Sequence, residues 1–207
     1  LRNGYEVIGT VRSASKTAST TSAIATVTPV DNLSFAEADL LSDTGWDEAM
    51  AGCTYVIHVA SPFVMAEPKD EKELITPAVD GTKRVVQAAQ RAGVSRLVLT
   101  SSIFAMIAGK DSGRYGPDSW SDTDADISAY AKSKTLAERA AWDINGNDTM
   151  ELTVINPGGV SGPPLNAQAH SSSVAMMSDM INGKMPMLPD LALNMVDVRD
   201  VARLHVT

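Results

Sequence analysis

The sequence predicts an α/β protein in which helices cover both faces of a doubly wound parallel sheet. Short apolar runs at 55–60, 96–102 and 152–156 indicate buried parallel strands, because such strands are covered on both faces. Longer segments at 71–92 and 128–141 have the composition and spacing of helices. Strands that alternate with helices along a chain are typical of a parallel sheet built from βαβ units.

The remaining elements are predicted from turn residues and shorter patterns. Before residue 55 we expect a turn at 3–4, a strand at 5–12, a strand with the loop after it at 33–40, a short helix and loop within 15–27, and a helix at 46–50. Gly93 ends the helix at 71–92, in which Pro77 predicts a kink or a late start. After residue 156 we expect a glycine-bearing loop to 164, a helix at 178–184, a loop at 185–194 and a helix start at 197–202.

The composition indicates one main core and argues against several classes of protein. The chain has 207 residues, 44% of them hydrophobic, and a formal net charge of −8, which disfavours binding to nucleic acid or an anionic membrane. No apolar run reaches the roughly 18 residues of a membrane span. The single cysteine, Cys53, has no partner for an internal disulfide, and no metal-binding spacing is found. We expect a cytoplasmic protein without a metal.

Tyr130 and Lys134 form the pattern that points most directly to chemistry. Strong helix formers surround them, so the two side chains should lie one helical turn apart on one face. A neighbouring ammonium lowers the pKa of a phenol from its usual value of about 10 towards the range of a general acid or base. The pattern is short, and a packed tyrosine beside a solvated lysine is the alternative.

Ser102 supplies a second polar group at the end of an apolar strand. The carboxyl ends of parallel strands are where α/β folds place their ligands, so this hydroxyl is positioned to bind a substrate carbonyl. A strand that simply ends in small polar residues is the alternative. His58 also lies in an apolar run, but we interpret it as a packed, hydrogen-bonded core residue rather than a catalytic one.

Together these features resemble the extended short-chain dehydrogenase/reductase family, in the branch of dihydroflavonol reductases, cinnamoyl-CoA reductases and microbial aldehyde or ketone reductases. The matching motifs are Thr-Ser-Ser at 100–102, Trp-Ser-Asp at 120–122, Tyr-Ala-Lys-Ser-Lys-Thr-Leu-Ala-Glu at 130–138, Ala-Trp at 141–142 and Asn-Pro-Gly-Gly-Val-Ser-Gly-Pro at 156–163. The resemblance covers nearly the whole chain. It implies a Rossmann-type fold with Ser102, Tyr130 and Lys134 as the catalytic residues.

Relatives in this family also carry segments that have no counterpart here. A first strand, a Gly-x-x-Gly-x-x-Gly phosphate loop and most of a helix would precede residue 5, and a substrate-covering segment would follow residue 207. We therefore expect 1–164 to be an N-terminally incomplete dinucleotide-binding domain and 165–207 the start of an incomplete substrate-binding portion. Without the first strand, two ladders of backbone hydrogen-bonding groups would be exposed in the sheet.

The residues after the strand at 5–12 bear on the choice of cofactor. An arginine at this point accommodates a 2′-phosphate, whereas an acidic residue would bind the ribose, so Arg12 with Ser13 and Lys16 favours NADP(H) over NAD(H). A solvated basic turn is the alternative. The resemblance implies further cofactor contacts at strand ends and loops, namely Asp39, Leu40, Val59, Ala60, Ser61, Thr100, Tyr130, Lys134, Pro157, Gly158, Val160 and Ser172. A helix cap is the alternative for Asp39.

The resemblance implies an NADPH-dependent reductase of a small aldehyde or ketone, with Tyr130 as proton donor. Ser102 would orient the carbonyl, and Lys134 would lower the pKa of Tyr130 and hold the nicotinamide ribose. Ile107 occupies the position of a substrate-binding asparagine in flavonoid reductases, which indicates an apolar pocket. A homodimer built on the helix at 71–92 is also implied. A sugar-nucleotide epimerase or dehydratase and a non-catalytic dinucleotide-binding sensor are the alternatives.

Overall fold

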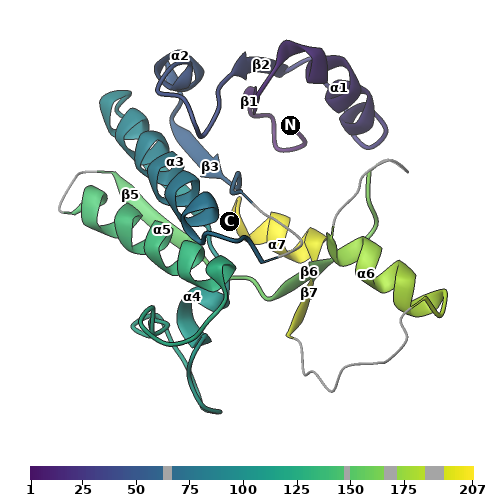
Figure 1. The fold of residues 1–207 in the computed structure, drawn as a ribbon. Coiled ribbons are helices and arrows are strands. Elements are labelled where there is room, and N and C mark those ends of the chain that lie inside the picture. The colour runs from purple at the N-terminus through teal and green to yellow at the C-terminus, as the bar shows by residue number, and fades with distance from the viewer. Residues whose placement is uncertain (63–66, 147–149, 166–171, 185–193) are drawn as a thin grey trace. The chain divides into compact units, whose positions relative to one another are not determined.

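Parallel strands and helices alternate along the computed structural model, which describes residues 1–62, 67–146, 150–165, 172–184 and 194–207 (Figure 1). The chain divides into two units, Leu1–Asn156 and Pro157–Thr207. A boundary after residue 164 is expected from the sequence. The observed boundary is earlier because a short strand inside the loop at 157–164 pairs with a strand at 195–197, which ties this loop to the second unit.

The strands of the first unit form two parallel sheets. β1 (Val7–Val11) pairs with β2 (Leu33–Glu37), and the other sheet has the order β3 (Tyr55–His58), β4 (Arg96–Thr100) and β5 (Glu151–Ile155). Every pairing is parallel, as in β4, where Val98 lies opposite Ile57 on one side and Thr153 on the other. The predicted α/β class and these five strands are confirmed. Among the described residues, β1 and β3 each keep one unpaired edge.

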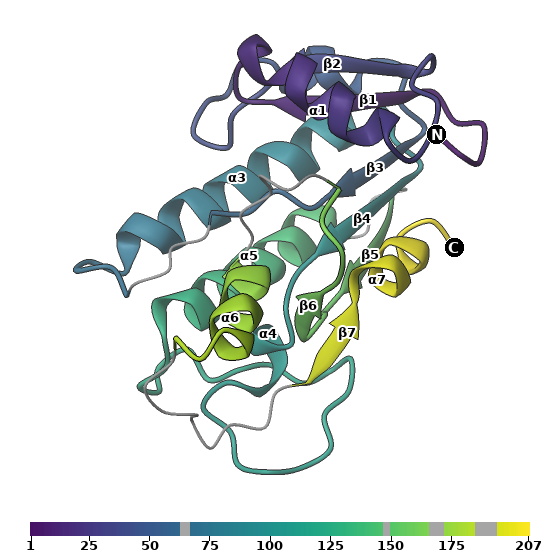
Figure 2. The same cartoon turned by 90° about the vertical axis from the view of Figure 1, so that its right-hand side faces the viewer.

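Two long helices build the centre of the first unit. α3 (Lys72–Arg91) and α5 (Ala129–Asn145) run side by side in both views (Figure 1 and Figure 2). α3 begins at Lys72 and continues through Pro77, so the late start suggested by the proline is not observed. α5 begins after Ser128, whose hydroxyl accepts a hydrogen bond from the Ala131 amide at 3.2 Å, the usual way in which serine starts a helix.

The core lies where these helices meet the middle strand. Val85 and Val86 of α3, Leu97 of β4 and Ala141 of α5 are almost completely buried in one cluster. Trp46, the first residue of α2 (Trp46–Met50), joins the same cluster, so the loop after β2 is anchored to this core. Burial of this apolar surface is the main favourable contribution to the stability of the unit.

Short elements account for most differences from the predicted secondary structure. η1 (Ala14–Lys16), α1 (Thr17–Ala25) and α7 (Val198–Leu204) fall where helices are predicted, and α6 (Ser172–Ile181) begins before the predicted start at 178. α4 (Phe104–Ile107), β6 (Gly159–Ser161) and β7 (Met195–Asp197) are not predicted, because three or four residues carry no readable period. Most of the predicted loop at 185–194 lies outside the described residues.

α3 approaches the loop after β2 closely at Gly81. A Cβ atom at this position would lie 2.8 Å from both Cβ and Cδ2 of Leu40. One turn later, Arg84 donates a hydrogen bond to the Leu40 carbonyl at 2.7 Å and forms an ion pair with Asp43. The missing side chain of Gly81 therefore allows α3 to hold the loop at 39–43 in place.

We predict that Gly81→Ala lowers the free energy of unfolding by about 1–3 kcal/mol, because the added methyl group overlaps Leu40. This cost exceeds the gain of up to about 1 kcal/mol that alanine brings to a helix. Urea denaturation measures the change, and a Leu40→Ala background should reduce it. Gly116→Ala is the control, since no atom lies within 4 Å of its added Cβ. A Gly81→Ala protein as stable as the wild type would contradict the close contact.

Candidate active site

Ser102 and Tyr130 come together at the carboxyl end of β4. Ser102 lies two residues beyond this strand and is buried, and its hydroxyl accepts a hydrogen bond from the Phe104 amide at 3.2 Å. Tyr130 lies in the first turn of α5, and its side chain is hydrogen-bonded to that of Ser102. The Phe104 ring packs edge-on against the Tyr130 ring, with 6.1 Å between the ring centroids. The two hydroxyls therefore meet in one place, at a strand end.

Lys134 lies one turn further along α5, on the same face as Tyr130. Its Nζ atom is 5.8 Å from the centroid of the Tyr130 ring, and only 8% of the residue is exposed. Burial lowers the pKa of Lys134 to about 8, and the nearby Glu138 carboxylate opposes this change. Lys134 therefore remains largely an ammonium at neutral pH, although it sits in a poorly hydrated environment.

The pKa of Tyr130 differs in direction from the prediction. Burial raises it above the ordinary value of 10.0, while the hydrogen bond to Ser102 acts in the opposite direction. We expect from the sequence that Lys134 lowers this pKa. The prediction is wrong in the structure because the loss of hydration, which sequence spacing does not reveal, dominates. Tyr130 therefore holds its proton firmly, as a proton donor must before it reacts.

The start of α5 is tethered by a segment that precedes α3. The carboxylate of Glu67 accepts a hydrogen bond from the Ala129 amide at 2.5 Å. Lys132 pairs with Glu71 at 2.8 Å, and this contact raises the pKa of Lys132. Both contacts flank Tyr130 along the helix. Neither is predicted, because the acidic residues lie about sixty positions earlier in the sequence.

His58 is buried, as predicted, but it is not a fully hydrogen-bonded core residue. Its Nε2 atom has no hydrogen-bond partner among the described residues. Burial, reinforced by the charge of Lys134, lowers its pKa to about 4. His58 is therefore a neutral imidazole near Lys134, and this proximity could not be predicted because the two residues lie 76 positions apart in the sequence.

Two further polar residues, Glu138 and Asn156, are linked by hydrogen bonds to the backbone of Ser102. Glu138, one turn after Lys134, is buried, and its carboxylate accepts a hydrogen bond from the Asn156 amide at 2.7 Å. The same Asn156 nitrogen donates to the backbone carbonyl of Ser102 at 3.2 Å. Both residues belong to motifs that carry the family resemblance, but neither is predicted as a site residue.

The basic residues predicted to bind a cofactor phosphate lie together after β1. Arg12, Ser13 and Lys16 are exposed, and Ser13 caps η1 by accepting a hydrogen bond from the Ser15 amide at 3.4 Å. No ion pair engages Arg12 or Lys16 in the described part of the chain. Their charges are therefore available to an anionic ligand.

The other cofactor candidates of the first unit lie at strand ends or just beyond them. The Asp39 carboxylate accepts the Leu41 amide at 2.9 Å and so closes a turn; it does not cap α2, whose cap residue is Gly45. Leu40 lies against Gly81 of α3, and its carbonyl accepts the hydrogen bond from Arg84. The rest follow β3 or end β4, namely Val59, Ala60, Ser61 and Thr100. Whether they touch a cofactor stays a prediction.

The remaining candidates belong to the second unit. Gly158 approaches the Asn194 carbonyl so closely that a side chain would not fit, since a Cβ atom would lie 2.1 Å from that oxygen. Val160 sits in β6, opposite Val196 of β7, and Pro157 is the first residue of the unit. Ser172 begins α6, but its side chain lies outside the described part of the structure.

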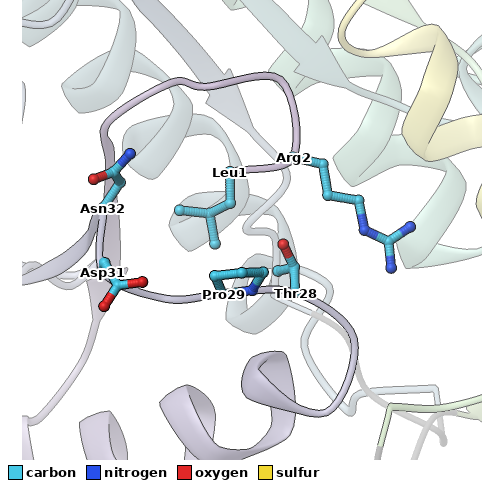
Figure 3. A pocket seen from close by; sticks show the side chains of 6 residues that line it. All are labelled: Leu1, Arg2, Thr28, Pro29, Asp31 and Asn32. Atoms are coloured by element: carbon cyan, nitrogen blue, oxygen red, sulfur yellow. The ribbon is translucent and has the colours of Figure 1, made fainter.

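A pocket of about 310 Å³ lies elsewhere in the first unit (Figure 3). Its lining is Leu1, Arg2, Thr28, Pro29, Asp31 and Asn32, none of which is a predicted site residue. In the described ranges, no three His, Cys, Asp or Glu side chains are grouped as a metal would require. No helix in those ranges combines the length and hydropathy needed to cross a membrane.

The chain is similar along its whole length to a known protein family and to named reductases. The profile of the NAD dependent epimerase/dehydratase family matches residues 1–207. A cinnamoyl-CoA reductase of Medicago truncatula is 35% identical over 216 residues, which cover 100% of this chain and 65% of the relative. A protein of Candida albicans named as a putative NADPH-dependent methylglyoxal reductase is 32% identical over 100% of this chain and 67% of its own length.

Solved structures show the same similarity. The yeast methylglyoxal/isovaleraldehyde reductase complexed with NADPH matches with a TM-score of 0.86 and 27% identity, over 99% of this chain and 67% of that one. Vestitone reductase from alfalfa (Medicago sativa) matches with a TM-score of 0.81 and 27% identity, over 100% of this chain and 65% of that one. The chain thus spans about two thirds of the length of these relatives.

The neutral state of His58 gives a prediction for stability against pH. An unfolded imidazole binds a proton below about 6.5, whereas His58 in the folded protein binds one only below about 4. The free energy of unfolding should therefore fall between pH 6.5 and 4, by up to about 1.4 kcal/mol per pH unit from this group. Urea denaturation over this range should show a shallower decline for His58→Phe. Above pH 7 the free energies of unfolding of the two proteins should change with pH in parallel. Equal slopes between pH 6.5 and 4 would contradict the lowered pKa of His58.

Proposed function

Because the chain belongs to the NAD dependent epimerase/dehydratase family, we propose that the protein is an NADPH-dependent reductase of a small aldehyde or ketone. The observation that carries the proposal is the hydrogen bond between Ser102 and Tyr130, with the Lys134 ammonium one turn further along the helix. Relatives named as methylglyoxal and cinnamoyl-CoA reductases support the same reaction class. The proposal includes a homodimer in the cytoplasm, for which the family resemblance and the composition are the grounds.

Each of the three residues has a distinct task in this reaction. The Ser102 hydroxyl donates a hydrogen bond to the substrate carbonyl oxygen and polarises it. Tyr130, which burial keeps protonated, gives its proton to the same oxygen as negative charge develops there. The Lys134 ammonium stabilises the phenolate that Tyr130 leaves behind. Bound NADPH supplies the hydride that reaches the carbonyl carbon.

The residues after β1 fit a cofactor that carries a 2′-phosphate. Arg12 and Lys16 offer two exposed positive charges, and Ser13 offers a hydroxyl between them. The Glu37 carboxylate accepts a hydrogen bond from the Ala14 amide in this turn at 3.0 Å and forms no ion pair with Arg12 or Lys16 among the described residues. A 2′-phosphate would therefore meet two cations, which favours NADP(H) over NAD(H).

Apolar side chains of α4 beside Tyr130 support an apolar substrate pocket. Phe104, which is 42% exposed, stands edge-on to Tyr130, and the half-buried Ile107 follows on the same short helix α4. An apolar wall next to the proton donor suits a small aldehyde or ketone better than a sugar nucleotide. A sugar-nucleotide epimerase would use the same Ser, Tyr and Lys, so the substrate assay has to separate the two activities.

We predict that Tyr130→Phe lowers kcat/KM for reduction of small aldehydes and ketones by about 10²- to 10⁴-fold, because no group replaces the lost proton. Oxidation of NADPH by the full-length protein, followed by absorbance, measures the loss. The exposed Tyr55→Phe is the matched control. Isomerisation of sugar nucleotides without net oxidation of the cofactor would contradict the reductase, as would binding without turnover.

We further predict that Arg12→Ala raises KM for NADPH by roughly 10- to 100-fold and leaves KM for NADH nearly unchanged. The range corresponds to the loss of one charge-assisted contact, worth about 1.5–3 kcal/mol. Initial rates with the two cofactors measure it. Arg91→Ala, which removes an exposed arginine paired with Asp47, is the control. Equal effects on both cofactors would argue against a phosphate contact at Arg12.

A further inference from the structure

Two polar residues, Glu138 and Asn156, link helix α5 near Lys134 to the backbone of Ser102. Glu138 lies one turn after Lys134 on α5, and only 7% of the residue is exposed. Its carboxylate accepts the Asn156 side-chain amide, which also donates to the Ser102 carbonyl. Asn156 directly follows β5, so this one amide joins helix α5 to the ends of two neighbouring strands.

A buried carboxylate needs a physical reason. Removing a charge from water costs several kcal/mol unless a partner charge and hydrogen bonds compensate. A neutral glutamine could also accept the Asn156 hydrogen bond, although more weakly, so this bond alone does not require a charge. The negative charge has a second effect, since Glu138 favours the protonated form of Lys134 against the effect of burial.

The other titratable groups around Lys134 cannot take over this task. Tyr130 faces Lys134 from the same helix, and it is a neutral phenol whose pKa is raised. His58 faces it from β3, and its pKa of about 4 leaves it neutral as well. Among the described residues, Glu138 is the anion that acts on Lys134.

We propose that Glu138 and Asn156 are positioning residues of the reductase: the buried Glu138 carboxylate keeps Lys134 charged, and the half-buried Asn156 fixes the backbone of Ser102 relative to α5. The inference rests on the proposed function. Neither residue contacts the substrate; both act through the residues that do. Glu138 favours the charged form of the Lys134 ammonium. Asn156 bonds both to the Ser102 backbone and to α5, the helix that carries Tyr130.

The charge component is tested by Glu138→Gln, which keeps the acceptor for Asn156 and removes the negative charge. Lysine labelled with ¹³C at Cε allows the full-length protein to be titrated by NMR, and Lys134→Arg identifies the signal. In the wild type Lys134 should titrate near pH 8, and in Glu138→Gln about one pH unit lower or more. Glu151→Gln, at an exposed carboxylate, should leave the titration unchanged. An unchanged Lys134 titration in Glu138→Gln would overturn the proposal.

The same variants should alter turnover in distinct ways. In Glu138→Gln, the alkaline decline of kcat should move to lower pH by the shift that NMR measures. Asn156→Ala should lower kcat roughly tenfold at all pH values, since Ser102 loses its support. A wild type that titrates as predicted but reduces no carbonyl would refute the reductase and leave the electrostatic link standing. An active wild type whose kcat profile is unaffected by Glu138→Gln would refute the positioning role alone.

Discussion

The candidate site depends on how deeply α5 is packed. Ser133, Thr135 and Ala141 are completely buried, so this helix meets its neighbours through small side chains and lies close to them. Two residues on the same helix, Lys134 and Glu138, are drawn out of water by that approach. Desolvation of these groups is unfavourable, and the contacts around them offset it. The Tyr130–Lys134 pair and the Asn156 link are therefore consequences of one packing arrangement rather than independent features.

Packing and chemistry act against each other at this helix. Burial makes the Tyr130 phenol a weaker acid and the Lys134 ammonium a stronger one. Both required forms are the protonated ones, so the usable pH range is limited on the alkaline side, where Lys134 loses its proton near pH 8. Glu138 widens that range from the alkaline side. His58 leaves it unchanged on the acid side, because it remains neutral until the pH is far below 7.

Much of the fold could be predicted from local pattern. The five strands of the first unit, α3 and α5 each carry an apolar run or a helical repeat, and Ser102 and Tyr130 follow from their positions on these elements. The three-residue strands β6 and β7 carry no period, so the pairing that joins the loop at 157–164 to the strand at 195–197 could not be predicted. The direction of the Tyr130 pKa depends on burial, which no spacing rule supplies. Glu138 and Asn156 lie within the motifs that carry the family resemblance. Their hydrogen bond joins separate elements, so it could not be predicted from the sequence.

The tether at the start of α5 differs from the link at its middle in one respect that matters for solution behaviour. Lys132 and Glu71 form their ion pair near the surface, where dissolved salt screens attraction between charges. The Glu138–Asn156 contact joins a buried carboxylate to a half-buried amide, so dissolved ions screen it less. Rising ionic strength therefore weakens the tether at the first turn of α5, which carries Tyr130, more than the link at the turns that carry Lys134 and Glu138. Added salt therefore destabilises the N-terminal turn of α5 more than the rest of the helix.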